Sequence, residues 1–128
     1  MIEIGENVEI TEGVRLLTHD GGVKVPMLMG LVENADLFGR IRIRNNVFIG
    51  MNAIVLPGIE FGNNVIVGAG SIVTRSIPDN SVVCGNPAHI LCTVEEYCTR
   101  NQYRIYLTDD LNYVEKKKAI EHIVGFKL

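Results

Sequence analysis

The stretch IRNNVFIGMNAIVLPGIEFGNNVIVGAGSI, residues 43–72, decides the fold. It divides into hexads, each opening with a large apolar residue: Ile43, Ile49, Val55, Phe61 and Val67. The fourth place of every hexad is Asn or Gly, the residues that adopt positive φ at the lowest cost. This pattern predicts short strands separated by a sharp turn at every sixth residue.

The same rhythm occupies the start of the chain. Hexads begin there at Ile4, Ile10 and Leu16. Across all eight hexads the fifth place is small or apolar except at Asp20: Val8, Val14, Val47, Ala53, Ile59, Val65 and Ser71. Three such sides form a coil of about 18 residues, and coils stack roughly 4.8 Å apart as parallel sheets. The sequence therefore predicts an all-β solenoid, a parallel β-helix of hexapeptide repeats.

Two other folds fit the period less well. An antiparallel β-sandwich would place its turns every 8–12 residues or so. An amphipathic helix would show an apolar period of about 3.6 residues. A strict period of six favours the β-helix over both.

The chain is expected to have two parts. Residues 1–91 form the β-helix, with residues 22–42 inserted as a projecting loop, and residues 92–128 form a helical cap. Thr93 and Glu96 make a capping box that opens one helix. A second helix is expected over about 108–124, ended by Gly125.

Composition excludes several classes of protein. A net charge of −3 and a pI near 5.6 argue against nucleic-acid binding. No apolar run approaches the ~20 residues of a membrane span. Cys84, Cys92 and Cys98 are odd in number and lack metal-ligand spacing, so we expect free thiols in a reducing compartment. With no leader sequence in the opening residues, this predicts a cytoplasmic protein.

A histidine stands where the rhythm breaks. His19 fills the fourth place of its hexad, so the pattern predicts a corner residue beside the base of the projecting loop. An imidazole exposed at such a place can act as a general base near neutral pH. If the corner prediction holds, His19→Asn should be at least as stable as the wild type.

Beyond the hexads, GAGSIVTRSIPDNSVVCGNPA, residues 68–88, is the specific segment, with THDGG at 18–22 and NADLFG at 34–39. Together they resemble the hexapeptide-repeat acyltransferases, especially maltose and galactoside acetyltransferases and O-acetyltransferases of polysaccharide biosynthesis. The resemblance implies a left-handed β-helix, a homotrimer with sites in clefts between subunits, and acetyl-CoA as donor. It implies one histidine per site and no metal.

The resemblance also implies a set of donor-binding residues. Ala69 would offer backbone contacts to the pantetheine arm, and Thr74 and Arg75 match a Thr-Lys pair beside the coenzyme. His89 would contact the phosphates or adenine of CoA. The backbone N–H of Met51 is the candidate oxyanion donor, although relatives often carry a small residue there.

On the acceptor side the resemblance assigns His19 as the general base. Asp20 could orient its imidazole, and Asp36 and Phe38 would line the acceptor site from this chain or its neighbour.

The predicted activity is transfer of an acetyl group from acetyl-CoA to a hydroxyl of a sugar or polysaccharide precursor. A non-catalytic trimeric β-helix module is one alternative. Another is a zinc carbonic anhydrase-like protein, which would need His19, His89 and His122 to converge on a metal.

Overall fold

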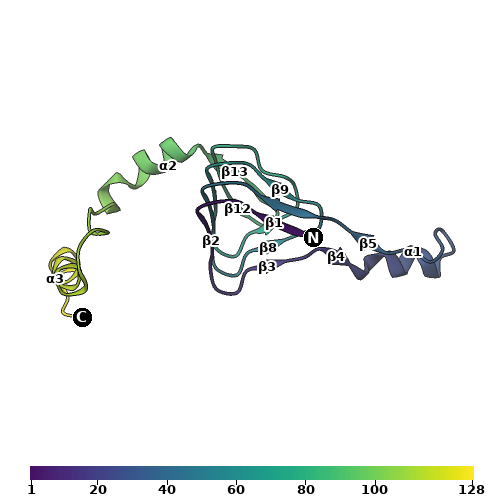
Figure 1. Cartoon of the computed structure of the whole chain (residues 1–128), viewed down its shortest axis with the longest axis horizontal. Coiled ribbons are helices and arrows are strands. Elements are labelled where there is room, and N and C mark those ends of the chain that lie inside the picture. The colour runs from purple at the N-terminus through teal and green to yellow at the C-terminus, as the bar shows by residue number, and fades with distance from the viewer. The chain divides into compact units, whose positions relative to one another are not determined.

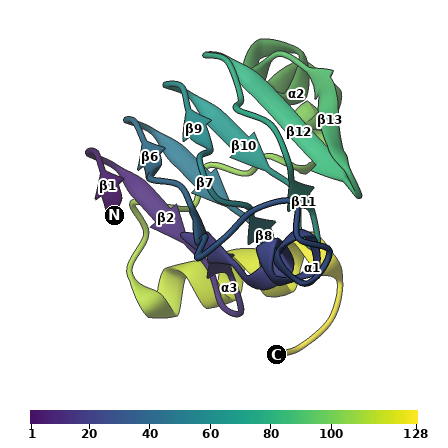
Figure 2. The same cartoon turned by 90° about the vertical axis from the view of Figure 1, so that its right-hand side faces the viewer.

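The computed structural model describes residues 1–128, in two compact units, Met1–Cys98 and Thr99–Leu128. The first unit is a stack of coils, seen end-on in Figure 1 and from the side in Figure 2.

Three sheets form its sides, here called faces A, B and C. Face A consists of β1 (Ile2–Ile4), β6 (Ile41–Ile43) and β9 (Glu60–Phe61). Face B consists of β2 (Val8–Ile10), β7 (Val47–Ile49), β10 (Val65–Val67), β12 (Ser81–Gly85) and β13 (Ala88–Cys92). Face C consists of β3 (Arg15–Leu16), β8 (Ile54–Val55) and β11 (Ile72–Val73).

The coils pair in parallel register, as the hexads predict. Val47 pairs with Val8 in the coil before it and with Val65 in the coil after it. Equivalent residues of the first and second coils are 39 positions apart in sequence. The separation is 18 positions between the second and third coils and 16 positions between the third and fourth. On the three faces of the solenoid, the exception is β13, which pairs antiparallel with β12. The predicted β-helix range, residues 1–91, therefore ends in a hairpin, because β13 folds back on β12.

The first and fifth places of the central hexads point into the core. The fully buried side chains are mostly theirs: Ile43, Val47, Ile49, Ala53, Val55, Phe61, Val65, Val67 and Ser71. In the first coil Ile4 is 52% exposed, because β1 lies at the edge of its sheet. Since burial of one such side chain contributes about 1.5–3 kcal/mol, the stacked interior is the main source of stability.

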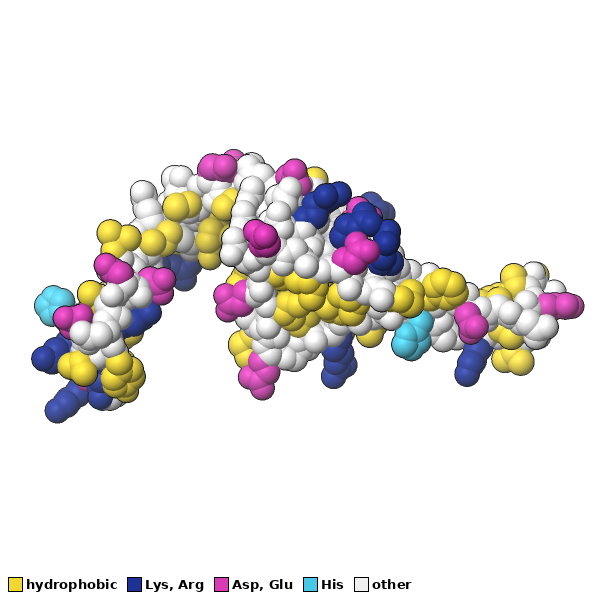
Figure 3. All heavy atoms as spheres, viewed as in Figure 1, with side chains coloured by type: hydrophobic (Ala, Val, Ile, Leu, Met, Phe, Trp, Pro, Cys, Tyr) yellow, Lys and Arg dark blue, Asp and Glu magenta, His cyan; other side chains and the backbone are white.

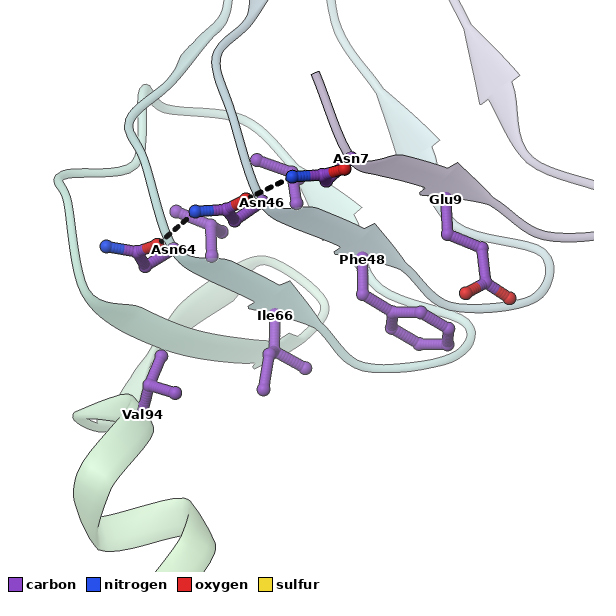
Figure 4. A pocket seen from close by; sticks show the side chains of 9 residues that line it. Asn7, Glu9, Asn46, Phe48, Asn64, Ile66 and Val94 are labelled. Carbon is purple, nitrogen blue, oxygen red and sulfur yellow. Dashed lines mark hydrogen bonds between the residues drawn. The ribbon is translucent and has the colours of Figure 1, made fainter. Parts of the chain in front are cut away.

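The fourth place of the hexads has the predicted backbone conformation. Positive φ occurs at all seven Asn and Gly positions: Asn7, Gly13, Asn46, Asn52, Gly58, Asn64 and Gly70. Three of these also form a ladder at the AB corner, between faces A and B. Asn7 Nδ2 donates to Asn46 Oδ1 at 3.0 Å, and Asn46 Nδ2 donates to Asn64 Oδ1 at 2.9 Å (Figure 4).

At the CA corner of the first coil, between faces C and A, the chain leaves the solenoid and forms an arm, residues 19–38 (Figure 1). The arm contains β4 (His19–Asp20), the 3₁₀ helix η1 (Gly21–Val23), α1 (Lys24–Leu28) and β5 (Leu37–Phe38). The solenoid resumes at Ile41, which pairs with Ile2. The insertion thus spans residues 19–38, whereas the predicted range was 22–42. It starts three residues earlier and ends four residues earlier than predicted.

The predicted corner conformation of His19 is wrong. His19 has no positive φ and lies in β4, antiparallel to β5. The pairing of His19 with Phe38, and a hydrogen bond from Gly39 N to Thr18 O, hold this segment extended. Extended pairing in the arm therefore replaces the turn that the hexad pattern predicts.

Helices follow the last strand. The Thr93–Glu96 capping box is present in both directions, and α2 spans Val94–Asn101. Another 3₁₀ helix, η2, spans Gln102–Arg104. In the second unit α3 spans Tyr113–Val124 and ends at Gly125, as predicted, but starts later than residue 108, because Asn112 caps it. No helix in the chain combines the length and the apolar character needed to cross a membrane.

Candidate active site

A pocket of about 560 Å³ lies at the base of the arm. His19, Asp20, Asp36 and Phe38 all line it. Four residues assigned to catalysis or acceptor binding thus come together, although Asp36 and Phe38 are well separated from His19 in sequence. The β4–β5 pairing is what brings the two segments side by side.

Asp20 makes a contact other than the expected one. Its Oδ1 accepts a hydrogen bond from Gly22 N at 2.8 Å and thereby caps η1. No hydrogen bond joins Asp20 to His19. Because successive residues of an extended strand point to opposite faces, Asp20 shapes the arm and does not orient the imidazole.

Lys24 and Met27 are among the lining residues of this pocket that sequence reasoning missed. Both lie on α1, three residues apart, and so share one face of the helix. The sequence analysis predicted residues 22–42 to be a loop, so it did not consider the three-residue helical spacing of Lys24 and Met27.

The BC corner, between faces B and C, carries Met51 and Ala69 at equivalent places in successive coils. Gly70 N donates to Met51 O at 2.7 Å, whereas the N–H groups of Met51 and Ala69 have no acceptor within the chain. A Cβ on Gly50 would lie 2.6 Å from Ala69 N, so the two coils are in close contact here. The corner therefore contains two backbone donors that have no acceptor within the chain.

The β12–β13 hairpin ends near the same corner. Cys84 packs against Gly68, since a Cβ on that glycine would lie 2.8 Å from the Cys84 Cβ. His89 lies opposite Cys84 in the hairpin, and its Nδ1 is 3.5 Å from the Pro87 carbonyl oxygen. His89 is exposed beside the BC corner.

Thr74 and Arg75 lie elsewhere, directly after β11 at the CA corner, and both are exposed. Thr74 is the fifth residue after Ala69, on the other side of face C, and a fully extended chain of this length would span roughly 16 Å. The candidate residues of one chain therefore form two groups, one along each edge of face C. The CA edge carries His19, Thr74 and Arg75, and the BC edge carries Met51, Ala69 and the hairpin with His89.

The strongest charge interactions lie away from both groups, on face A. Glu3 accepts hydrogen bonds from Arg40 and Arg42 at 2.9 and 2.8 Å, and Arg42 also binds Glu60 at 2.9 Å. The hydrogen bond from Arg42 is the main reason that the pKa of Glu3 is lowered. Face A therefore carries a network of ion pairs.

The three histidines lie on β4, β13 and α3. No group of three or more His, Cys, Asp or Glu side chains in the chain is arranged to hold a metal ion.

Comparison with known proteins gives concordant matches. Residues 40–75 match the family model for the hexapeptide repeat of succinyl-transferase. Protein CapG of Staphylococcus aureus is 50% identical over 117 residues, which are 91% of this chain and 67% of CapG. Galactoside O-acetyltransferase of Escherichia coli is 35% identical over 96 residues, covering 74% of this chain and 45% of that protein.

Solved structures agree. A hexapeptide-repeat acetyltransferase from Vibrio cholerae, complexed with acetyl coenzyme A, has a TM-score of 0.62 at 27% identity, over 73% of this chain and 49% of that one. A galactoside acetyltransferase in complex with coenzyme A has a TM-score of 0.62 at 31% identity, over 85% of this chain and 50% of that one. The chain spans two thirds of CapG and about half of these other relatives. Repeat, register and relatives together show that the chain belongs to the hexapeptide-repeat acyltransferase family.

Proposed function

We propose that this chain is an acetyl-CoA-dependent O-acetyltransferase that modifies a hydroxyl of a sugar or polysaccharide precursor. The observation that carries the proposal is the pocket that joins His19 to Asp36 and Phe38 at the base of the arm. Relatives of the same family have been solved with acetyl coenzyme A or coenzyme A bound. Family membership also favours left-handed winding of the coils.

The groups at the two edges of face C suit acyl transfer. The imidazole of His19 takes the proton of the acceptor hydroxyl as the oxygen attacks the thioester carbonyl. The negative charge that develops on the carbonyl oxygen is stabilised by the N–H of Met51. When the carbon–sulfur bond breaks, the His19 imidazolium returns the proton to the CoA thiolate, and the acetyl ester is released. No external oxidant, reductant or metal is needed for this balance.

The proposal requires a trimer, because one chain keeps His19 and Met51 on opposite edges of face C. Three copies with face C turned toward a common axis would bring the CA corner of one against the BC corner of the next. Arg15 lies in register with Ile54 and Ile72 on face C. The apolar outward side chains of this face are Leu17, Ile54, Leu56 and Ile72, which are partly exposed in the single chain. Burying them around an axis would stabilise such an assembly.

The acceptor would lie against Phe38 and Asp36. A sugar presents an apolar ring face, which packs on an aromatic ring, and hydroxyl groups, which donate to a carboxylate. Lys24 and Met27 complete the wall on the α1 side. The three cysteines are free thiols, and we infer a reducing, cytoplasmic location.

The test is an acetyl-CoA turnover assay that detects the released CoA thiol, run against a panel of sugars with His19→Ala as control. We expect thiol release that depends on both the sugar and His19. A confirmed trimer that releases no thiol with any acceptor would favour the non-catalytic module. Zinc found in the purified protein by metal analysis would favour the carbonic anhydrase-like alternative.

A further inference from the structure

The core of the solenoid holds a polar side chain at a place where its pattern favours an apolar one. Charged side chains gather on the outside of the solenoid, as Figure 3 shows. Inside, the buried side chains are apolar apart from two serines, Ser71 at 0% exposure and Ser81 at 4%. Ser71 takes the place that Ala53 has in the preceding coil, one residue before the register pair of Ile54 and Ile72. Because a buried hydroxyl is unfavourable without hydrogen bonds, the partners of Ser71 indicate what it does.

The first partner of Ser71 lies in the BC corner. In the preceding coil this turn is closed by backbone atoms, since Ala53 N donates to Gly50 O at 3.2 Å. In the third coil the equivalent carbonyl, that of Gly68, accepts a hydrogen bond from the Ser71 hydroxyl at 2.6 Å. The turn that contains Ala69, with its unpaired N–H, is therefore closed by a side chain.

The second partner of Ser71 lies in the β12–β13 hairpin. Gly85, the last residue of β12, donates from its N–H to Ser71 Oγ at 3.2 Å. The imidazole of His89 packs against the same glycine, because a Cβ on Gly85 would lie 3.2 Å from His89 Cε1. One buried hydroxyl thus joins the turn that holds Ala69 to the glycine that supports His89.

We propose that Ser71 is a positioning residue for the coenzyme, which sets the spacing between the Ala69 N–H and the His89 imidazole. This inference rests on the acetyl-CoA dependence of the proposed function and on the donor-binding roles assigned to Ala69 and His89. A ligand that contacts two groups binds tightly when both are held in place beforehand, since less freedom is then lost on binding. Ser71 is itself fully buried, so it acts through these two neighbours and touches neither the coenzyme nor the reacting atoms.

The chain offers a matched pair of serine variants. Ser71→Ala removes both hydrogen bonds and should fold, because Ala53 fills the equivalent place in the preceding coil. Ser81→Ala is the control, since Ser81 is also buried and its hydroxyl donates to Asp79 O at 3.1 Å. Ser81 begins β12, at the opposite end of the strand from Gly85. Both variants should lower the thermal unfolding midpoint, and Ser71→Ala alone should affect the coenzyme.

Calorimetric titration with CoA measures this effect without an acceptor. Ser71→Ala should raise the Kd for CoA on the order of 10-fold, the effect of losing one typical hydrogen bond. Ser81→Ala should leave the Kd nearly unchanged. In turnover assays the KM for acetyl-CoA should rise with the Kd, whereas kcat at saturating acetyl-CoA should stay near the wild-type value, because His19 and Met51 are untouched.

Ser71→Thr tests whether the hydroxyl is responsible. Threonine has the shape of valine, and Val14 occupies the equivalent place in the first coil, so the added methyl group should be accommodated. This variant keeps the hydroxyl and should bind CoA more tightly than Ser71→Ala. A folded Ser71→Thr that binds CoA as weakly as Ser71→Ala would contradict the inference.

A double-mutant cycle tests the connection to His89. His89→Ala should weaken CoA binding less in the Ser71→Ala background than in the wild type, because the imidazole is already displaced there. Arg75→Glu, on the opposite edge of face C, should have the same effect in both backgrounds. Full additivity of Ser71→Ala and His89→Ala would refute the connection.

The inference and the proposed function can fail separately. A folded Ser71→Ala with wild-type affinity for CoA, or an equal loss of affinity in Ser81→Ala, overturns the inference alone. A wild type that binds CoA but releases no thiol with any acceptor overturns the proposed function, while the calorimetric comparison still decides the role of Ser71. A wild type that does not bind CoA overturns both.

Discussion

His19 lies directly opposite Phe38 across the antiparallel pair of β4 and β5. Side chains that face each other in this way lie on one side of the sheet, with Cβ atoms about 5 Å apart. The imidazole and the phenyl ring therefore share one wall of the pocket. The arm, and not a solenoid corner, holds the candidate base.

His19→Ala should lower kcat on the order of 10²–10⁴-fold, the usual contribution of a general base. His19 is exposed, so the thermal unfolding midpoint should change little. His19→Asn should lose as much activity without the added stability that a corner position would give, because the backbone here is extended. Steady-state kinetics and thermal melts check this. Retained turnover in a folded His19→Asn trimer would remove the histidine from the chemistry.

Arg75→Glu should raise the KM for acetyl-CoA with less effect on kcat, since the exposed guanidinium would bind the anionic coenzyme. Added salt should weaken coenzyme binding in the wild type more than in the variant. Titrating KM against ionic strength tests both statements, with Lys118→Glu on α3 as control. Equal salt dependence in wild type and variant would place Arg75 outside the donor site.

Gly50→Ala should destabilise the solenoid by about 1–3 kcal/mol, the usual cost of overpacking. The added methyl would meet backbone atoms, Ala69 N at 2.6 Å and Val67 O at 2.8 Å, which cannot move aside cheaply. Gly21→Ala is the matched control, because nothing lies within 4 Å of its new Cβ. Chemical denaturation measures the difference. Equal stability of the two variants would mean that the coils separate more easily at this corner than the distances indicate.

Glu3→Gln should remove a pH-dependent part of the stability. The hydrogen bond from Arg42 lowers the pKa of Glu3 below its ordinary value of 4.5. The folded state thus favours the ionised carboxyl, whose contribution is complete above pH 4.5 and is lost as pH falls through the lowered pKa. Denaturation curves at neutral and acidic pH should show wild type and variant converging in acid. Glu12→Gln serves as the control, and a gap that persists in acid would contradict the assignment.

The sequence predicts the solenoid well because the hexad pattern depends on residues that are close together in the chain. Each Asn or Gly in the fourth place needs positive φ, and the apolar residues beside it need a core, so Asn46, Asn64 and Gly70 behave as the pattern predicts. The arm follows no such rule. His19 pairs with Phe38 through a contact distant in sequence, and a six-residue period carries no information about it.

The site was predictable only in part, for a related reason. Motifs locate Met51, Ala69, Thr74 and Arg75 along the chain. They do not tell that face C lies between the first two and the last two. Lys24 and Met27 became visible only once α1 had formed, because their shared face depends on helical geometry.

Both departures from the 18-residue step fall at the same CA corner. The arm enters between Leu16 and Ile41, and two residues are missing between Val73 and Ile77. At the AB and BC corners, by contrast, the strands of the first three coils follow one another at nearly constant spacing. The CA corner is therefore the position of the scaffold where a segment can be exchanged while the strands of the coils keep their pairing register. Lineages could diversify, and engineers could graft, at residues 19–38 without redesigning the coils.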